Sequence, residues 1–469
     1  MKPVWTRGWA VVLLIVANAS LGRGAGIKAG FAERDITPDI GMEQTSTYYK
    51  AYHRTFHDPC KVRVADFDDG NQKIALVGID ALLVPRLVVL QARAEIEKTC
   101  GIKAFAVMIG ASHSRSSGPV GIVLPNQCDD ASAEIRKLAY EDKVAFNRRF
   151  RMKNGQIWTH PGVENPDVID YAGPIDPQVG VVGAWDEEGK RLGCIVNFSC
   201  HATTSPGGIS ANWPFYVEET IQGAMRSRAP VVFPQGACGD VTRVDNLSAE
   251  VRPTNEDWAR RVGGRVGAEA VKVFLSAPRG TDLSVDARQK TCPIKRRVPS
   301  PARVARAREI IMAGKPSGDT TNWVFAKEIL PLDYLISVEP AVAVEVQAIQ
   351  VGPRVCISNP AECFVEYGLE MKSGSPFPFT FPVELANGCV GYVPTAEAFG
   401  PHEGGYETRL TSYNNLKITA GKQFAEIGIA PTRQLIPGRA PEHARVSRGS
   451  TPSRYFLPST YGNVPPDAD

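Results

Sequence analysis

Four residues that can bind a metal ion follow short apolar segments, either directly or after a brief turn. These are His113 after 107–112, His201 after 194–200, Glu362 after 355–358 through Asn359-Pro360-Ala361, and Tyr392 after the segment around 383–385. In an open α/β sheet, ligands and reactive groups collect at the C-terminal ends of the strands. Two imidazoles and a carboxylate form a common ligand set of hydrolytic zinc, which leaves a position for water or substrate. The pattern predicts a metallohydrolase.

Each candidate also has a plainer interpretation. A single histidine in such a place is more often a half-buried core residue, and a buried tyrosine usually packs and donates one hydrogen bond. Glu362 could instead be the first-turn acid of a helix that starts at Cys363. Because His113 and His201 both lie at predicted strand ends among Gly, Ser and Thr, with Glu362 in an equivalent place, metal binding is the favoured interpretation.

Composition fits a globular enzyme and excludes some other classes. The 469 residues are 43% hydrophobic and 22% charged, which is enough apolar material for a large core. The net charge is only +3 and no dense Lys/Arg run occurs, so we expect no nucleic-acid partner. The ten cysteines include no C-x-x-C pair, so a thiolate zinc site is not expected. They are also too sparse for a disulfide scaffold, although an oxidising compartment would permit a few bridges.

Apolar strand segments alternate with segments of helical periodicity. We predict helices over 86–99, 214–227, 256–275, 302–312 and 363–372. This order favours an α/β fold, with a mostly parallel or mixed sheet and flanking helices. We expect a single catalytic domain with its site at the C-terminal ends of the strands.

The two ends of the chain differ from this pattern. Lys2 and Arg7 precede an apolar run over 9–17 and small residues that fit a secretory cleavage signal, so residues 1–24 are predicted to be a signal peptide. Residues 25–429 would form the catalytic domain. Residues 430–469, rich in Pro, Arg and Ser, would be a poorly ordered tail. The protein is therefore expected to be secreted or periplasmic.

Several motifs, in order, resemble the N-terminal catalytic domain of the neutral/alkaline, non-lysosomal ceramidases, which are zinc amidohydrolases. They are Gly30 to Pro38 (GFAERDITP), Asp80, His113 with Ser117-Gly118-Pro119, Asn147-Arg148, His201 to Thr204 (HATT), Gly239 to Thr242 (GDVT), Asn359 to Glu362 (NPAE), Tyr392 to Thr395 (YVPT) and Tyr406-Glu407. The likeness covers about residues 27 to 410. Each motif alone is weak, but their shared order is fairly specific.

The resemblance implies zinc as cofactor, held by His113, His201, Glu362 and Tyr392. It implies an N-acyl substrate, either a small molecule or a lipid such as ceramide, and it allows peripheral contact with a membrane. The oligomeric state stays open.

Three further residues are catalytic candidates through the resemblance. Arg148 would polarise a carbonyl near the metal, although basic neighbours also suit a surface arginine. Thr242 takes the place of the family's functional serine, or it merely closes a turn. Arg115 stands where the family usually has a second histidine, and an arginine cannot shuttle protons near neutral pH.

Residues that would support the metal ligands can also be predicted. Asp80, at a strand end, could orient a ligand histidine. The turn containing Gly236, Gly239 and Asp240 could point backbone amides into the site.

Three functions stay open at this level. The first is an exported zinc amidohydrolase resembling the ceramidases. The second is a zinc enzyme of the same fold that acts on a different polar or carbohydrate substrate, for which Arg115 and the Arg148-Arg149 pair would suit an anionic group. The third is a catalytically impaired binding paralogue, suggested by the substitutions at positions 115 and 242.

Export yields the first testable prediction. The mature chain should begin between Ser20 and Ile27, because the small-residue cleavage signals lie there. Intact-mass measurement of protein recovered from the periplasm or the medium checks this, and retention of Met1 would contradict it.

Overall fold

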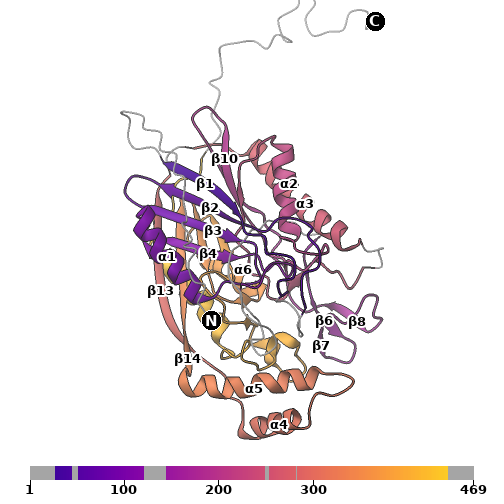
Figure 1. The fold of residues 1–469 in the computed structure, drawn as a ribbon. Coiled ribbons are helices and arrows are strands. Elements are labelled where there is room, and N and C mark those ends of the chain that lie inside the picture. Colours follow the sequence, from indigo (N-terminus) through magenta and orange to yellow (C-terminus); the bar gives the residue numbers. More distant parts are fainter. Residues whose placement is uncertain (1–26, 45–50, 121–143, 249–252, 281–282, 442–469) are drawn as a thin grey trace, which may run out of the picture.

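The computed structural model describes residues 27–44, 51–120, 144–248, 253–280 and 283–441. The predicted signal peptide and residues 442–469 of the predicted tail lie outside these ranges. Within the described ranges, mixed sheets lie among seven α-helices (Figure 1), so the predicted α/β fold is confirmed. Several small sheets, rather than a single one, make up the β structure.

Two four-stranded sheets form most of the framework. The first has the order β1 (Lys28–Asp35), β2 (Lys61–Asp68), β3 (Lys73–Ile79) and β4 (Val107–Ala111). The second has the order β13 (Val285–Lys295), β14 (Ala341–Val351), β15 (Arg354–Ser358) and β17 (Phe379–Val383). In each sheet the last pair is parallel and the other pairs are antiparallel.

Smaller sheets complete the β structure. A three-stranded sheet has the order β11 (Val231–Val232), β10 (Arg191–Asn197) and β9 (Gly180–Trp185), and a second has the order β7 (Ile157–Thr159), β6 (Arg149–Met152) and β8 (Val168–Tyr171). Two-stranded pairs join β12 (Val241–Thr242) to β5 (Phe146–Asn147) and β16 (Glu362–Cys363) to β18 (Tyr392–Val393).

Three of the parallel strand pairs are joined by a helix between their strands. The connections are β3–α1 (Arg86–Cys100)–β4, β10–α2 (Trp213–Ala224)–β11 and β15–α6 (Val365–Gly374)–β17. A crossover helix between parallel strands brings both strand ends to the same edge. His113, His201 and Glu362 follow β4, β10 and β15, so the parallel parts of the fold carry the site.

The edges of these sheets are joined by backbone contacts. Gly110 in β4 forms an antiparallel bridge with Ala386 beyond β17, and the Ala111 amide donates to the Leu385 carbonyl at 3.1 Å. The Glu384 amide donates to the Gln235 carbonyl beyond β11 at 2.9 Å. These contacts bring three separate strand ends to one place.

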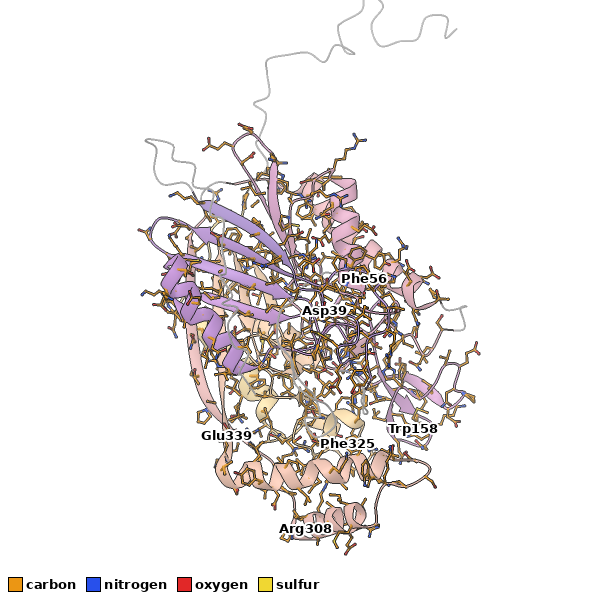
Figure 2. The ribbon with its side chains drawn as sticks, viewed as in Figure 1. Asp39, Phe56, Trp158, Arg308, Phe325 and Glu339 are labelled. Carbon is orange, nitrogen blue, oxygen red and sulfur yellow. The ribbon has the colours of Figure 1, made fainter. Side chains whose placement is uncertain are left out.

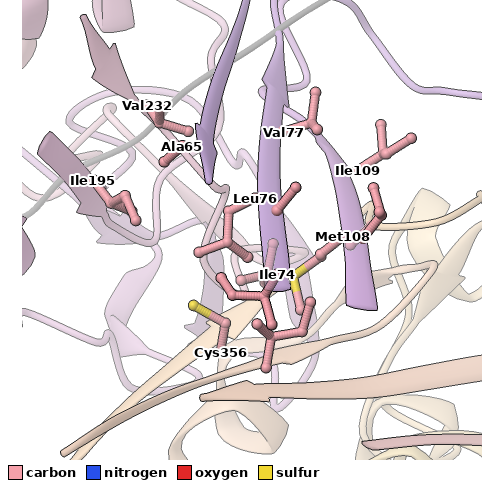
Figure 3. Packing of buried hydrophobic residues seen from close by; sticks show 14 of the residues in the cluster. Ala65, Ile74, Leu76, Val77, Met108, Ile109, Ile195, Val232 and Cys356 are labelled. Atoms are coloured by element: carbon pink, nitrogen blue, oxygen red, sulfur yellow. The ribbon is translucent and has the colours of Figure 1, made fainter. Parts of the chain in front are cut away.

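The sheets pack around several hydrophobic clusters. Figure 3 shows one of them, to which Leu76 and Met108 of the first sheet and Cys356 of the second all belong. Burial of such side chains supplies most of the free energy that holds the sheets together.

The other helices lie outside these crossovers. They are α3 (Asn255–Ser276), which packs against α2, α4 (Pro301–Met312), which packs against α5 (Thr321–Val338), and α7 (Ala420–Thr432), which packs against α6. All five predicted helices are confirmed, whereas α5 and α7 were not predicted. Helix α7 extends beyond residue 429, and Leu435 is buried.

Two further properties concern the described ranges. The nine cysteines found there carry free thiols, and Cys194 and Cys356 are buried in strands. Within the same ranges, no helix has the length and apolar character needed to cross a membrane.

Candidate metal centre

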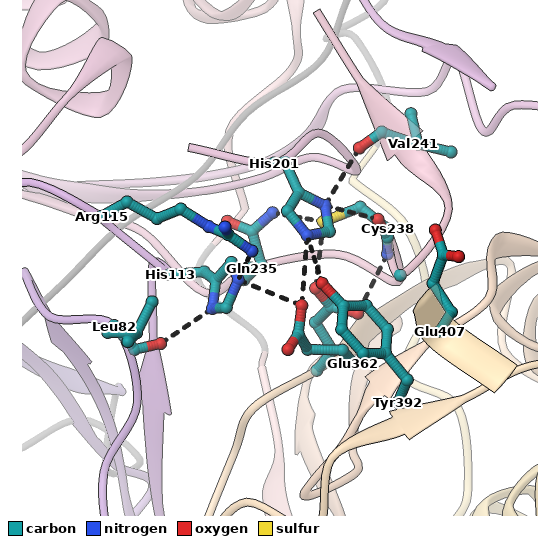
Figure 4. A network of polar contacts seen from close by, with 12 residues as sticks. Leu82, His113, Arg115, His201, Gln235, Cys238, Val241, Glu362, Tyr392 and Glu407 are labelled. Atoms are coloured by element: carbon teal, nitrogen blue, oxygen red, sulfur yellow. Dashed lines mark hydrogen bonds and ion pairs between the residues drawn. The ribbon is translucent and has the colours of Figure 1, made fainter. Parts of the chain in front are cut away.

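His113, His201 and Glu362 converge in the interior of the protein (Figure 4). The Nε2 atoms of His113 and His201 lie 3.0 and 3.1 Å from the same oxygen, Oε2 of Glu362. The two imidazole rings stand edge to face, with centroids 4.9 Å apart. All three side chains are at most 1% exposed. The structure therefore brings together the three residues that were predicted at strand ends.

His113 enters the site through an unusual backbone conformation. Its φ of 60° lies in the left-handed region, which non-glycine residues adopt rarely and mostly where the surroundings enforce it. The backbone bends here just after β4, and the Nδ1 atom faces the Leu82 carbonyl at 2.9 Å. Nε2 is thereby aimed at Glu362.

His201 is held by the loop that follows β11. Its Nδ1 atom lies 2.7 Å from the Cys238 carbonyl and 3.1 Å from the Val241 carbonyl. Gly239 allows this loop to approach Glu362 closely, since a Cβ atom there would lie 2.5 Å from the Glu362 carbonyl oxygen. The glycine requirement is steric.

Glu362 is the first residue of β16. Its amide donates to the Gly391 carbonyl at 3.0 Å, and β16 pairs in parallel with β18, which begins at Tyr392. The second carboxylate oxygen, Oε1, accepts a hydrogen bond of 2.7 Å from the Tyr413 hydroxyl. Glu362 therefore belongs to the site and is not a cap of α6, which begins at Val365.

The protonation states favour a bound cation. Each Nδ1 faces a carbonyl and so carries the proton of a neutral imidazole, which leaves a lone pair on Nε2. Burial lowers the pKa of His113, and burial with the charge of Arg148 holds the pKa of His201 well below its usual value.

These groups fit a metal ion. Two lone pairs and a carboxylate oxygen face one point, and only a positive charge there makes the arrangement favourable. The ligand atoms lie within 4.8 Å of one another. Nitrogen and oxygen donors in this number suit zinc, and the Nδ1 contacts are the usual support of histidines that bind a metal.

Tyr392 lies beside this ligand set. Its hydroxyl is 3.3 Å from Nε2 of His201, and the two rings are stacked at an interplanar angle of 6°. Burial and the nearby Glu362 carboxylate raise the pKa of Tyr392 well above its usual value. The phenol oxygen is thus placed within reach of a metal ion. In the chain, Tyr392 begins β18 and does not follow β17 directly.

Arg148 is a buried residue of the site and not a surface arginine. Its Nη1 atom lies 3.2 Å from Nε2 of His201, while Nε donates to Glu407 at 2.9 Å and Nη2 donates to the Gly239 carbonyl at 2.6 Å. The guanidinium carbon lies 5.4 Å from the ring centroid of Tyr392 and 5.0 Å from that of Tyr406. A charge fixed on so many sides is well placed to stabilise negative charge near His201.

The remaining catalytic candidates also lie near the ligands. Nη2 of Arg115 is 3.5 Å from Nε2 of His113. Thr242 is buried in β12, next to the Val241 carbonyl that faces His201. Arg149 points elsewhere, because it donates to Glu403 at 2.9 Å and lies over the Phe364 ring.

Two predictions about supporting residues are wrong. Asp80 accepts hydrogen bonds from Arg63 and the Lys61 amide, and Nδ1 of His113 faces a carbonyl instead. The Gly236 and Gly239 amides donate to backbone carbonyls. The carbonyls of this loop face the site instead. They accept hydrogen bonds from His201 and Arg148.

Comparisons with known proteins identify the fold. No family model matches the chain, and no curated protein matches it in sequence. A ceramidase structure solved in complex with C2 aligns at a TM-score of 0.61 and 16% identity, over 90% of this chain and 77% of that chain. The neutral ceramidase from Pseudomonas aeruginosa aligns at a TM-score of 0.58 and 18% identity, with the same coverage. The chain has the neutral-ceramidase fold. The resemblance drawn from the sequence motifs is therefore confirmed for the fold.

Within this neutral-ceramidase fold, sequence reasoning missed several supporting residues. Tyr413 binds Glu362, and Glu407 binds Arg148. The fully buried Glu384 accepts hydrogen bonds from the Cys238 and Cys363 amides at 3.0 and 3.1 Å, which ties the loop of His201 to the strand of Glu362. Glu407 stood in a recognised motif, whereas nothing in the sequence pattern singled out Tyr413 or Glu384.

Tyr413 provides a test of the metal centre. Replacing it by phenylalanine removes the hydrogen bond to Oε1 of Glu362 but keeps the ring. Because residues that orient a metal ligand typically change affinity by about 10- to 100-fold, Tyr413→Phe should weaken zinc binding by that factor. Competition with a chelator measures the affinity. The matched control is Tyr334→Phe, at an exposed tyrosine of α5, which should leave it unchanged. An unchanged affinity in Tyr413→Phe would contradict the assigned role.

Proposed function

We propose that the chain is an exported zinc-dependent amidohydrolase that cleaves an N-acyl bond with water, in the manner of the ceramidases. The observation that carries the proposal is the convergence of His113, His201 and Glu362 on one point. The shared fold supports it, since both matched structures are ceramidases. The catalytic domain would span residues 25–429.

Zinc fits the donor set of two imidazoles, a carboxylate and a nearby phenol oxygen. When bound, zinc lowers the pKa of a water molecule toward about 7 and polarises a carbonyl. The ion would be held by His113, His201, Glu362 and Tyr392. The Nδ1 contacts of both histidines fix their rings, so little reorganisation is needed for binding.

The chain's other residues would act on the amide. Arg148 would stabilise negative charge that develops on the carbonyl oxygen, since its guanidinium is already held by Glu407 and Gly239. Thr242 would offer a hydroxyl hydrogen bond to the substrate. Arg115 cannot supply the proton transfer of a histidine near neutral pH, so its contribution would be electrostatic.

The substrate would be a small-molecule or lipid N-acyl compound. One matched structure is a ceramidase complexed with C2. A lipid substrate would bring the exported enzyme into peripheral contact with a membrane.

The proposal predicts different effects for two substitutions. Glu362→Gln should abolish turnover with little loss of fold, because it removes the only carboxylate among the proposed ligands. Thr242→Ala should lower the rate by about 10²- to 10³-fold at most, the value of one hydrogen-bond donor to the reacting group. Rates on a panel of N-acyl substrates, with thermal melts of each variant, provide the measurement.

A matched control is Glu309→Gln, which makes the same change at an exposed site on α4 and should keep full activity. Activity like that of the wild type in Glu362→Gln would remove the metal-ligand assignment, and with it the proposed mechanism.

A further inference from the structure

Residues 406–416, called here the 406–416 segment, place two side chains against the metal centre. Glu407 accepts a hydrogen bond of 2.9 Å from Nε of Arg148. The Tyr413 hydroxyl donates to Oε1 of Glu362 at 2.7 Å. The orientation of one proposed ligand and of the proposed electrostatic residue therefore depends on where this segment lies.

Little of this segment belongs to regular secondary structure. It contains a 3₁₀ turn, Tyr406–Thr408, and one isolated antiparallel bridge between Leu416 and Arg296. Because the carbonyls of such a segment have few helix or strand partners, other groups must supply the hydrogen-bond donors that fix it. Several of these donors belong to a single residue outside the segment.

Arg297 supplies these donors. Its Nη1 and Nη2 atoms donate to the Thr408 and Asn414 carbonyls at 3.0 and 2.9 Å. Its Nε atom donates to the Leu416 carbonyl at 3.0 Å, and its backbone amide donates to the Asn415 carbonyl at 2.6 Å. One guanidinium thus joins three points of the segment, near its start and near its end.

Two of the three carbonyls belong to residues next to the side chains that reach the site. Thr408 directly follows Glu407, and Asn414 directly follows Tyr413. Because each residue has only two soft backbone dihedral angles, a carbonyl held in place restricts how far the residue before it can move. Arg297 therefore limits the movement of both Glu407 and Tyr413.

The Arg297 guanidinium suits this position through its shape as well as its charge. Its carbon lies 4.8 Å from the ring centroid of Phe399, and among the described residues all its hydrogen-bond acceptors are backbone carbonyls. Burial, and then the charge of Arg303, lower the pKa of Arg297 to about 10, so it stays protonated at neutral pH and keeps every donor. A lysine would keep the charge, but its compact ammonium cannot present donors in a planar fork.

Helix α5 also contacts the segment. The guanidinium carbon of Arg409 lies 4.6 Å from the ring centroid of Phe325, which Figure 2 labels on α5. The Ser412 hydroxyl donates to Glu328 on the same helix. Because these contacts do not involve Arg297, its loss should displace the segment locally and leave the fold in place.

We propose that Arg297 is a positioning residue for the hydrolysis, which fixes the segment at the metal centre. It acts on Glu362 through Tyr413, and it acts on Arg148 through Glu407. This rests on the proposed function and adds a residue that works only through others. Without it, the ligand carboxylate and the guanidinium that stabilises negative charge would both be less well oriented. Metal affinity and kcat should therefore fall, whereas KM should change little.

Arg297→Gln tests the proposal, with Arg354→Gln as its matched control. Arg354 is another half-buried arginine beside an aromatic ring, but it begins β15, at the end of that strand opposite Glu362. Arg297→Gln should weaken zinc binding, measured by competition with a chelator, by about 10- to 100-fold. In zinc-saturated protein, kcat on the N-acyl substrate that the wild type hydrolyses fastest should fall by about 10- to 100-fold, with little change in KM. Arg354→Gln should leave all three quantities unchanged.

A double-mutant cycle tests the route through Tyr413. Tyr413→Phe already removes the hydroxyl that reaches Glu362. Adding Arg297→Gln to it should therefore lower the zinc affinity by less than the two single losses combined. Purely additive losses would overturn the proposal, because they would mean that Arg297 does not act through this tyrosine.

Arg297→Lys separates shape from charge. It should lose most of the zinc affinity that Arg297→Gln loses, because three carbonyls need the planar fork of a guanidinium. Full recovery by lysine would overturn the proposal. If the glutamine variant does not fold, Arg297→Lys measured beside Arg354→Lys decides.

The outcomes separate this proposal from the proposed function. Zinc affinity and kcat like those of the wild type in Arg297→Gln would overturn the positioning role and leave the amidohydrolase. Weakened zinc binding in Arg297→Gln, in a protein that hydrolyses no amide, would overturn the proposed function and leave the role of Arg297 at the metal centre.

Discussion

Three electron-rich atoms face one point in the interior of this protein, and that constraint shapes the surrounding structure. Nε2 of His113 and Nε2 of His201 both lie within hydrogen-bonding distance of Oε2 of Glu362, yet both imidazoles direct their Nδ1 protons at backbone carbonyls. A buried carboxylate beside two lone pairs is unfavourable unless a cation is bound. The histidines resist protonation because burial lowers their pKa values. A metal ion is the cation that fits.

The fold maintains this arrangement by joining sheets at their edges. Each ligand follows a strand of a parallel pair, and the three pairs belong to three sheets. Contacts at Ala386 and Glu384 bring those edges together. Burial, above all, raises the pKa of Glu384 well above its usual value, and this side chain links the loop of His201 to the strand of Glu362. The ligand geometry thus depends on residues that are not themselves proposed metal ligands.

The sequence predicted most of the framework and the identities of the ligands. Apolar runs that end in His113 and His201 were strong signals, because a fully apolar run that stops at a polar residue is a clear pattern. The helix α5 was missed because its apolar residues extend around much of its surface, and Pro331 lies inside it. Asp80 was misassigned because nothing local indicates that Arg63, from a neighbouring strand, would engage it.

Other features depend on contacts distant in sequence. Tyr413 meets Glu362 across 51 positions, and Glu384 meets Cys238 across 146. The left-handed backbone of His113 is set by its surroundings, since position 113 is not a glycine that would suggest it. Arg148 and Arg149 are adjacent, yet only the alternation of side chains along the backbone decides which one faces the ligands.

The central claim is that a metal ion occupies the point shared by the three ligands. Crystals grown with zinc, measured at wavelengths on both sides of the zinc absorption edge, test it most directly. The account predicts one anomalous peak that disappears below the edge, within about 2.0–2.2 Å of Nε2 of His113, Nε2 of His201 and a carboxylate oxygen of Glu362. Density showing the two imidazoles bonded directly to Glu362, with no anomalous peak between them, would contradict it.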